Sequence, residues 1–264
     1  MTDKTLLIIS GRPEAAAVAQ AAKAMGLTVV VSDSDPHAPG FAFADSCLIA
    51  DVQGASETAA AAERYSRKIR RIDGVVLMAD APLTVATVAQ RLRLPGIALH
   101  VAELLADRLA VKRSFQSAGI ASPWSAEIST PQELQRAVIA RGRALIVKPV
   151  ENRGPEGVAA LAQVEDFAAA FLAARAASPT ERVMVEEDAG GALVAGLMQA
   201  GAWLGDDAVR DALGRAASAV GLSDGPVVAR IAVQQGVAQV SELSPRLAGD
   251  QLLDAAIRQA LADA

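Results

Sequence analysis

The stretch VSELSPRLAGD, residues 240–250, places a carboxylate (Glu242), a hydroxyl (Ser244) and a guanidinium (Arg246) at alternate positions near the end of an apolar strand. Side chains at positions i, i+2 and i+4 of a β-strand point to the same side, so these three groups could face one ligand. A glycine turn follows the strand. The pattern is compatible with a metal and phosphate site or with the polar end of a surface hairpin, and the rest of the chain must decide between them.

The composition of the 264-residue chain is that of a globular protein with room for two small domains. Its net charge of −5 comes from interspersed acidic and basic residues, which predicts neither a nucleic-acid partner nor a membrane-binding patch. No apolar run approaches the roughly 18 residues of a membrane span. The single cysteine, Cys47, excludes an intrachain disulfide and favours a cytoplasmic location. Its apolar surroundings, DSCLIAD, predict a buried and unreactive thiol.

The first half of the chain alternates apolar strands with helices. The runs TLLIIS, LTVVVSD and GVVLMAD are predicted strands, and EAAAVAQAAKAMG, ETAAAAERYSRKIR and LTVATVAQRLRL are predicted helices. This alternation indicates a parallel sheet covered on both faces. Ligands of such sheets bind at the carboxyl ends of the strands, where the candidates are Ser10, Gly11, Asp33, Asp35 and Asp80. The turn GRPEAA lacks the G-x-G-x-x-G pattern, which argues against a nicotinamide-dependent dehydrogenase.

The pattern of predicted helices and strands changes near residue 122, and this change marks the predicted domain boundary. Before it, VAELLADRLAVKRSFQSAG, residues 101–119, is predicted to be one long helical segment. After it, RALIVKPV and RVMVEED are predicted strands, and AGG leads into an Ala-rich helical stretch. The runs PVVARIAV and VAQVSELS then form a predicted hairpin around QQG.

Two features of this second half suit a nucleotide. Lys148 ends a predicted strand and precedes a loop with Gly154 and Gly157, so its ammonium could meet phosphate oxygens while loop amides close over them. The strand that ends in Glu186 and Glu187 could present backbone groups to a base. Either feature alone is also what a solvated strand end would show.

The order of these features resembles the ATP-grasp superfamily. The blocks DSDPHAPGFAFAD, LPGI, LLADRLAVKRSFQSAGIASP, IVKP, VMVEE and SELSPRLAGD are similar in turn to motifs of carbamoyl-phosphate-synthetase-like and amino-acid ligases, and they span essentially the whole chain. The resemblance implies an α/β fold: a doubly wound, parallel-sheet pre-ATP-grasp domain, residues 1–121, then a shortened ATP-grasp α+β domain, residues 122–264. It also implies that ATP, with Mg²⁺, activates a small carboxylate as an acyl phosphate for attack by an amine.

On the phosphate and base side, the resemblance implies roles for residues of the second half and of the segment before it. Lys148 would contact the α- and β-phosphates, and Arg108 stands where the family has an earlier phosphate-binding lysine. The remaining nucleotide-binding candidates are Gly154, Gly157, Glu186, Glu187 and Asp188, from the glycine loop and the adenine-side strand end.

On the metal side, Glu242 matches the principal metal-bridging carboxylate of the family, and Ser244 stands where an asparagine is usual. Arg246 matches an arginine that contacts the γ-phosphate or the substrate. Two residues depart from the family pattern: Arg230 stands where the other metal carboxylate is expected, and Glu156 in the glycine loop would oppose phosphate charge. The lobe between Glu187 and Glu242 is also several dozen residues shorter than usual.

The predicted hairpin places Arg230 near Glu242. A three-residue QQG loop would pair Val233 with Val237 and Arg230 with Val240, one pair away from Glu242 on the same face. Arg230 could then hold Glu242 in a charge-assisted pair, which predicts fewer bound metal ions than in a typical ATP-grasp ligase. If Arg230 points to solvent instead, the pair has no energetic weight.

Two functional hypotheses follow. The first is a compact ligase that joins a small carboxylate, such as an amino acid, to an amine, and Lys148, Glu242 and Arg246 favour it. The second is a degenerate relative that binds nucleotide without turnover, as a regulatory or scaffolding subunit; Arg230, Ser244 and the shortened lobe favour it. The resemblance and the Ala-rich helices also lead us to expect a homodimer built through the first domain.

Overall fold

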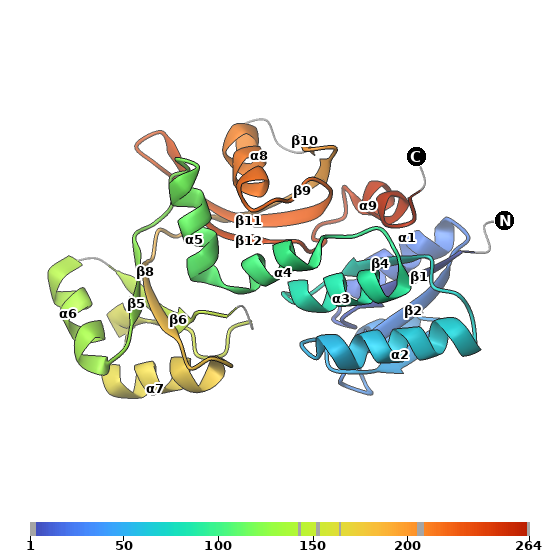
Figure 1. Cartoon of the computed structure of the whole chain (residues 1–264), viewed down its shortest axis with the longest axis horizontal. Coiled ribbons are helices and arrows are strands. Elements are labelled where there is room, and N and C mark those ends of the chain that lie inside the picture. Colours follow the sequence, from blue (N-terminus) through green and yellow to red (C-terminus); the bar gives the residue numbers. More distant parts are fainter. Residues whose placement is uncertain (1–3, 142–143, 152–153, 164, 205–208, 263–264) are drawn as a thin grey trace.

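The computed structural model describes residues 4–141, 144–151, 154–163, 165–204 and 209–262, and these form three four-stranded sheets surrounded by helices (Figure 1). The predicted α/β fold class is confirmed. One sheet is parallel and lies in the first half of the chain, as expected, whereas the other two are antiparallel.

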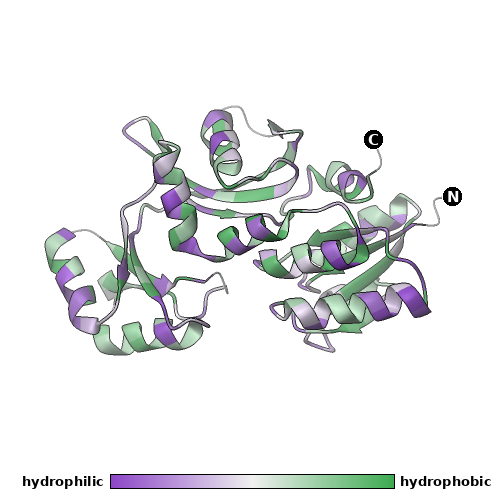
Figure 2. Cartoon of the chain, viewed as in Figure 1, coloured by the Kyte–Doolittle hydropathy of each residue, from purple (hydrophilic) through white to green (hydrophobic). Residues whose placement is uncertain are grey.

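The parallel sheet is covered on both faces. Its strands, in the spatial order β3-β2-β1-β4, are β1 (Thr5–Ile9), β2 (Thr28–Asp33), β3 (Ser46–Ile49) and β4 (Gly74–Leu77). Around it lie α1 (Ala15–Ala24), η1 (Pro39–Phe43), α2 (Ala55–Lys68) and α3 (Pro82–Leu92). Leu6 and Ile8 of β1 share a core with α1, whereas Leu7 and Ile9 share one with α2 and α3. Both faces of β1 are therefore buried, which is why the strand is apolar throughout (Figure 2).

Cys47 lies on the edge strand β3 and is exposed, contrary to the prediction. Leu48 packs against the core beneath α2, so the alternate residues Cys47 and Ile49 point to the other face, where both are exposed. The prediction of a buried thiol was wrong because an edge strand at the margin of the helical layer is covered on one face only. Partial desolvation raises the pKa of the Cys47 thiol, so the exposed group gains no thiolate character at neutral pH.

The long helix predicted over residues 101–119 is divided into α4 (Leu99–Ala106) and α5 (Arg108–Ser117). The break lies at Asp107, whose backbone is extended and forms an isolated β-bridge with Glu151. The Asp107 carboxylate accepts a hydrogen bond of 2.8 Å from the amide of Ala110 and so caps the N-terminus of α5. Apolar periodicity continues across the break, so the pattern alone did not reveal it.

The second sheet, in the order β5-β8-β6-β7, carries the predicted lysine strand. Its strands are β5 (Ser125–Ile128), β6 (Leu145–Pro149), β7 (Ala159–Ala160) and β8 (Val183–Glu187). Helices α6 (Pro131–Arg141) and α7 (Phe167–Ala177) lie against the sheet, with the short η2 (Leu161–Gln163) beside it. The predicted strands RALIVKPV and RVMVEED correspond to β6 and β8.

The third sheet, in the order β10-β9-β11-β12, contains the first half of the stretch VSELSPRLAGD. Its strands are β9 (Ala192–Gln199), β10 (Ala202–Leu204), β11 (Gly225–Gln234) and β12 (Val237–Ser244). Helix α8 (Arg210–Ala219), together with α4 and α5, shares the core of this sheet. A β9–β10 hairpin follows the AGG sequence, where the sequence predicted entry into a helical stretch; the predicted helix is α8 and comes later.

Two segments connect the halves of the chain. Helices α4 and α5 precede residue 122 but pack on the third sheet, and the last helix, α9 (Leu253–Ala260), packs against α1 and β4 of the first. The division at residue 122 therefore stays a prediction. Among the described helices, none has the length and apolar character needed to cross a bilayer.

The break at Asp107 gives a testable stability effect. Asp107→Ala removes the α5 cap and a 2.8 Å ion pair with Arg182, and we expect a loss of about 1–2 kcal/mol in urea unfolding. The matched variant Asp166→Ala removes a cap of α7 that accepts two amide hydrogen bonds and should cost only about 1 kcal/mol. A larger cost for Asp166→Ala would contradict the proposed weight of the Arg182 pair.

The stabilising effect of Asp107 should also depend on pH. Burial alone would raise the pKa of Asp107, but Arg182 and the Ala110 amide outweigh it and hold the pKa below its ordinary value of 3.8. A carboxyl whose folded pKa is lowered stabilises the native state above its unfolded pKa, and this contribution is lost as the pH falls through the folded pKa. The stability difference between the native chain and Asp107→Ala should therefore shrink below pH 3.8.

Candidate functional site

A buried carboxylate, Glu186 on β8, holds two lysines. Lys112 on α5 donates a hydrogen bond of 2.8 Å to Glu186 Oε1, and Lys148 Nζ on β6 lies 2.7 Å from Oε2 in an ion pair without hydrogen-bond geometry. The side chains of all three residues are no more than 8% exposed. Glu186 pairs with Ile146 across the β6–β8 ladder, so Lys148 is its diagonal neighbour on the same face.

Lys112 is the site residue that sequence reasoning missed. Leu109, Lys112 and Phe115 are spaced three apart on the buried side of α5, which places an ammonium among apolar residues. This spacing was visible in the sequence and was a usable signal, because a lysine on the apolar face of a helix needs a partner. Burial lowers the pKa of Lys112, and the adjacent Glu186 opposes this effect.

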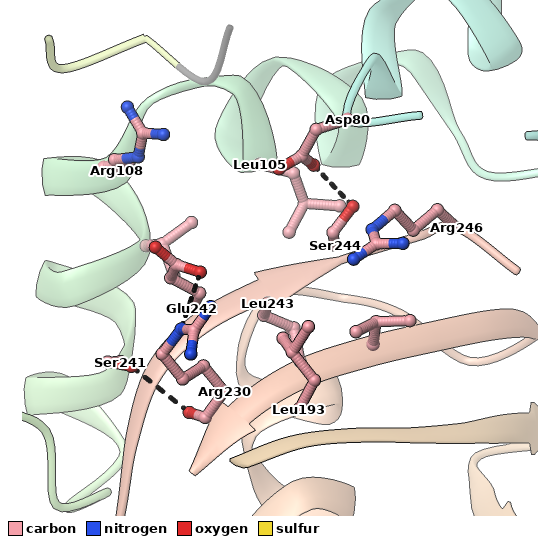
Figure 3. A pocket seen from close by; sticks show the side chains of 12 residues that line it. Asp80, Leu105, Arg108, Leu193, Arg230, Ser241, Glu242, Leu243, Ser244 and Arg246 are labelled. Atoms are coloured by element: carbon pink, nitrogen blue, oxygen red, sulfur yellow. Dashed lines mark hydrogen bonds and ion pairs between the residues drawn. The ribbon is translucent and has the colours of Figure 1, made fainter. Parts of the chain in front are cut away.

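The charged chain continues into the third sheet through Glu242. Lys148 Nζ lies 3.7 Å from Glu242 Oε1. Arg230 Nε donates to Glu242 Oε2 at 3.4 Å (Figure 3). Burial alone would raise the pKa of Glu242, but Lys148, Arg230 and Arg108 together lower it. Glu242 therefore remains ionised and links residues of the second and third sheets.

The predicted Arg230–Glu242 pair is confirmed, but the predicted ladder was wrong. Gln234 pairs with Val237 around a two-residue turn, Gln235–Gly236, in which both residues have positive φ. A bulge between Arg230 and Ile231 then places Arg230 directly opposite Glu242 instead of Val240. The two errors arise because neither the turn length nor a bulge is encoded in the alternation of apolar residues.

The three groups of the opening stretch line one pocket, but the intervening Ser241 and Leu243 line it too, so simple alternation does not account for the arrangement. Its twelve lining residues include Glu242, Ser244 and Arg246, and its empty volume is about 470 Å³, counting the part open to solvent (Figure 3). Ser244 Oγ donates a 2.5 Å hydrogen bond to Asp80 Oδ1, beyond the end of β4. Arg246 forms no ion pair or hydrogen bond with other described residues. The pocket therefore contains a guanidinium and a carboxylate from different parts of the fold.

The other candidates at the first sheet's carboxyl edge have structural roles. Asp33 accepts a 2.7 Å hydrogen bond from the Gly11 amide and a 3.1 Å bond from the Asp35 amide, so it shapes its own turn. Ser10 is buried with a positive φ of 81°, and its amide donates to the carbonyl of Ser32. Asp80, by contrast, lines the pocket.

Arg108, at the first turn of α5, reaches the start of the glycine loop. Its Nη1 donates hydrogen bonds to the carbonyls of Pro149 (2.7 Å) and Glu151 (2.9 Å), and the residue lines the pocket. Burial lowers the pKa of Arg108, while nearby carboxylates, Glu242 first, act to raise it. An arginine remains charged under such conditions, so Arg108 adds a cation beside the loop.

The two loop glycines differ in their surroundings. A Cβ at Gly157 would lie 2.8 Å from Ala174 Cα and from Ala177 Cβ, so this glycine is needed for packing against α7. Gly154 has a φ of +80° and open space around it. Glu156 is exposed, and Asn152 and Arg153 lie outside the described residues. Gly154 is thus the loop glycine with room for a ligand beside its backbone.

The acidic end of β8 is tied to its surroundings. Glu187 forms a 2.9 Å ion pair with Arg141, whose guanidinium stacks 4.1 Å from the ring centroid of Trp124. Asp188 is exposed, and its carboxylate accepts a 3.0 Å hydrogen bond from the Gly190 amide. The amides of Glu187 and Asp188 donate to backbone carbonyls of the protein. The proposed base-binding role of this segment stays a prediction.

The donor set does not fit a pair of metal ions. Carboxylates and carbonyls are the ligands that Mg²⁺ prefers, but the oxygens of Glu242 face Lys148 and Arg230. The Ser244 hydroxyl is directed to Asp80. The described residues contain no group of three or more histidine, cysteine, aspartate or glutamate side chains arranged to hold a metal. Cationic side chains, suited to phosphate or carboxylate, dominate the pocket instead.

Comparisons with known proteins place the fold. No family model and no curated sequence matches the chain. Among solved structures, an L-amino acid ligase from Bacillus licheniformis superimposes with a TM-score of 0.73 at 18% identity, covering 98% of this chain and 74% of its own. An ADP complex of N5-carboxyaminoimidazole synthetase from Staphylococcus aureus gives 0.74 at 16% identity, covering 99% and 78%. A biotin carboxylase complex from Campylobacter jejuni gives 0.70 at 16%, covering 98% and 71%.

These similarities extend over nearly the whole chain, so the chain has the fold of ATP-grasp carboxylate–amine ligases. The resemblance drawn from the sequence motifs is confirmed at the level of the fold. At identities of 16–18%, the likeness establishes the fold alone.

The burial of Glu186 between two lysines predicts the order in which three substitutions destabilise the protein. Glu186→Gln leaves Lys112 without its counter-charge and Lys148 with only the longer pair to Glu242, and it should cost about 3–5 kcal/mol in urea unfolding. Lys112→Met should cost less, because Glu186 keeps Lys148. Arg141→Met breaks the more exposed pair with Glu187 and should cost about 1 kcal/mol or less. Equal losses for the first two variants would show that Glu186 does not compensate both lysines.

Proposed function

We propose that this protein is an ATP-dependent ligase that activates a small carboxylate for attack by an amine. The observation that carries the proposal is the position of Lys148, buried against Glu186 on the second sheet and 3.7 Å from Glu242 on the third. A fixed ammonium between two sheets, next to a pocket lined by arginines, suits the phosphates of a nucleotide. ATP, when bound, supplies the phosphoryl group that activates the carboxylate.

Different residues of the chain bind the phosphates, the base and the carboxylate substrate. Lys148, Arg108 and the open backbone at Gly154 hold phosphate groups, and the end of β8 lies beside the base. Arg246 orients the substrate carboxylate or the terminal phosphate. Asp80 lines the same pocket as Arg246 and offers a counter-charge to an ammonium. A substrate with both an amine and a carboxylate, such as an amino acid, matches this pair of charges.

The named neighbours support the general reaction. One is an L-amino acid ligase, and others were determined as complexes with ADP or ATP. Their identities, 14–18%, restrict this support to the general reaction. The homodimer and the cytoplasmic location expected from the sequence remain predictions.

A second candidate function is nucleotide binding without turnover, in a regulatory or scaffolding subunit. The observation that favours it is Arg230, which lies directly opposite Glu242 where the sequence resemblance implies a second metal carboxylate. An arginine at that position removes a metal ligand and adds a positive charge. Binding and turnover must therefore be measured separately.

Nucleotide binding is tested by thermal unfolding. A nucleotide at about a hundredfold its Kd should stabilise the native chain by about 2.7 kcal/mol, because it binds the folded state only. Lys148→Ala should lose most of this shift, measured from the melting temperature of the variant itself without nucleotide. Lys68→Ala, at the exposed end of α2, is the matched control and should keep it. The absence of any shift with ATP or ADP would exclude both candidate functions.

Turnover is tested by ADP release across a panel of amino acids and small amines. A ligase should release ADP only when both carboxylate and amine are present, and Arg246→Ala should lower the rate about a hundredfold. Arg258→Ala, an exposed arginine on α9, should leave it unchanged. Nucleotide binding without ADP release under any condition would favour the second candidate.

A further inference from the structure

The pocket contains an arginine in a position that decides how phosphate charge is neutralised. Arg230 Nε lies 3.4 Å from Glu242 Oε2, and Nη1 donates to the carbonyl of Gly191 at 3.4 Å. Ser241, the extra residue of the bulge, donates its hydroxyl to the Arg230 carbonyl at 3.3 Å (Figure 3). The side chain is thus held from β12 and from the residue before β9, on a strand in the middle of the sheet.

We infer that Arg230 takes the place of a divalent cation, so that the protein binds its nucleotide without requiring Mg²⁺. The inference rests on the proposed nucleotide site and specifies its charge chemistry. A guanidinium offers five N–H donors in a planar fork that matches phosphate oxygens. Arg230 lines the pocket with a side chain that is 40% exposed. Its interactions within the described residues use Nε and Nη1, which leaves the donors of Nη2 for a ligand.

The balance of charge supports this assignment. The pocket is lined by three arginines, Arg108, Arg230 and Arg246, and by two carboxylates, Asp80 and Glu242. Behind Glu242, the two lysines on Glu186 add one further net positive charge. The site as a whole therefore carries an excess of two positive charges, which attract a polyphosphate. A glutamate at position 230 would remove this excess entirely.

The same arrangement disfavours a metal ion. A dication beside Glu242 would lie next to two fixed cations, Lys148 and Arg230. A dication and a unit cation a few ångströms apart repel by about 2–8 kcal/mol in partly solvated surroundings. The second carboxylate of the pocket, Asp80, accepts a hydrogen bond from Ser244. Glu242 thus acts as the counter-ion of Arg230 and Lys148.

The test is isothermal titration of the full chain with ADP and ATP, in EDTA and in excess Mg²⁺. The expected result is binding in EDTA with an affinity within a few-fold of that in Mg²⁺. Binding in Mg²⁺ alone would overturn this inference while leaving the nucleotide site in place. Failure to bind in either condition would overturn the proposed function, and this inference with it.

Arg230→Glu tests the inference in the opposite direction, because it places two carboxylates opposite each other on β11 and β12. Its affinity in EDTA should fall by about tenfold or more, and Mg²⁺ should restore it. Arg67→Glu makes the same charge change on the exposed face of α2 and should alter neither titration. Arg230→Gln keeps nearly the same shape without the charge and should also lose affinity in EDTA. An affinity in EDTA that is unchanged in Arg230→Gln would overturn the inference.

Discussion

The architecture of the site depends on the pairing of one buried carboxylate with two ammonium groups. Glu186 lies on β8, and its partners lie on α5 and β6, so three elements are connected through a single side chain. Buried charges are tolerated only when they are compensated, and the position of each element is therefore coupled to the others. Lys148 extends the same chain of charges to Glu242 and so brings the third sheet into the site.

The break between α4 and α5 serves the same arrangement. Because the chain is extended at Asp107, α5 begins at Arg108, whose guanidinium then reaches the carbonyls at the start of the glycine loop. One turn later, Lys112 faces Glu186. A continuous helix would lack the β-bridge between Asp107 and Glu151 that fixes this starting point. The cap and the bridge thus determine where two cations of the site lie.

Most of the first sheet could be predicted from the sequence, because strands buried on both faces leave an unbroken apolar run such as residues 5–9. The features that escaped prediction are set by contacts distant in sequence. The exposure of Cys47 depends on which helices cover β3, and Glu186, the partner of Lys112, lies on a strand 74 residues further along the chain. The polar residues of the opening stretch line one pocket because they are close together in the sequence, whereas the bulge that aligns Arg230 with Glu242 required the fold.

Helix α9 and strand β1 lie at opposite ends of the chain and yet share one hydrophobic core, in which Leu253 and Ile257 pack with Leu6 and Ile8. During synthesis, β1 leaves the ribosome well before α9. Strand β4 is an edge of its sheet, and a Cβ on Gly74 would lie 2.8 Å from the Ala260 carbonyl oxygen, so α9 covers that edge closely. Until α9 arrives, β4 is an open apolar edge of the kind that recruits other chains. The nascent protein is therefore vulnerable to aggregation in the interval between the synthesis of β4 and that of α9.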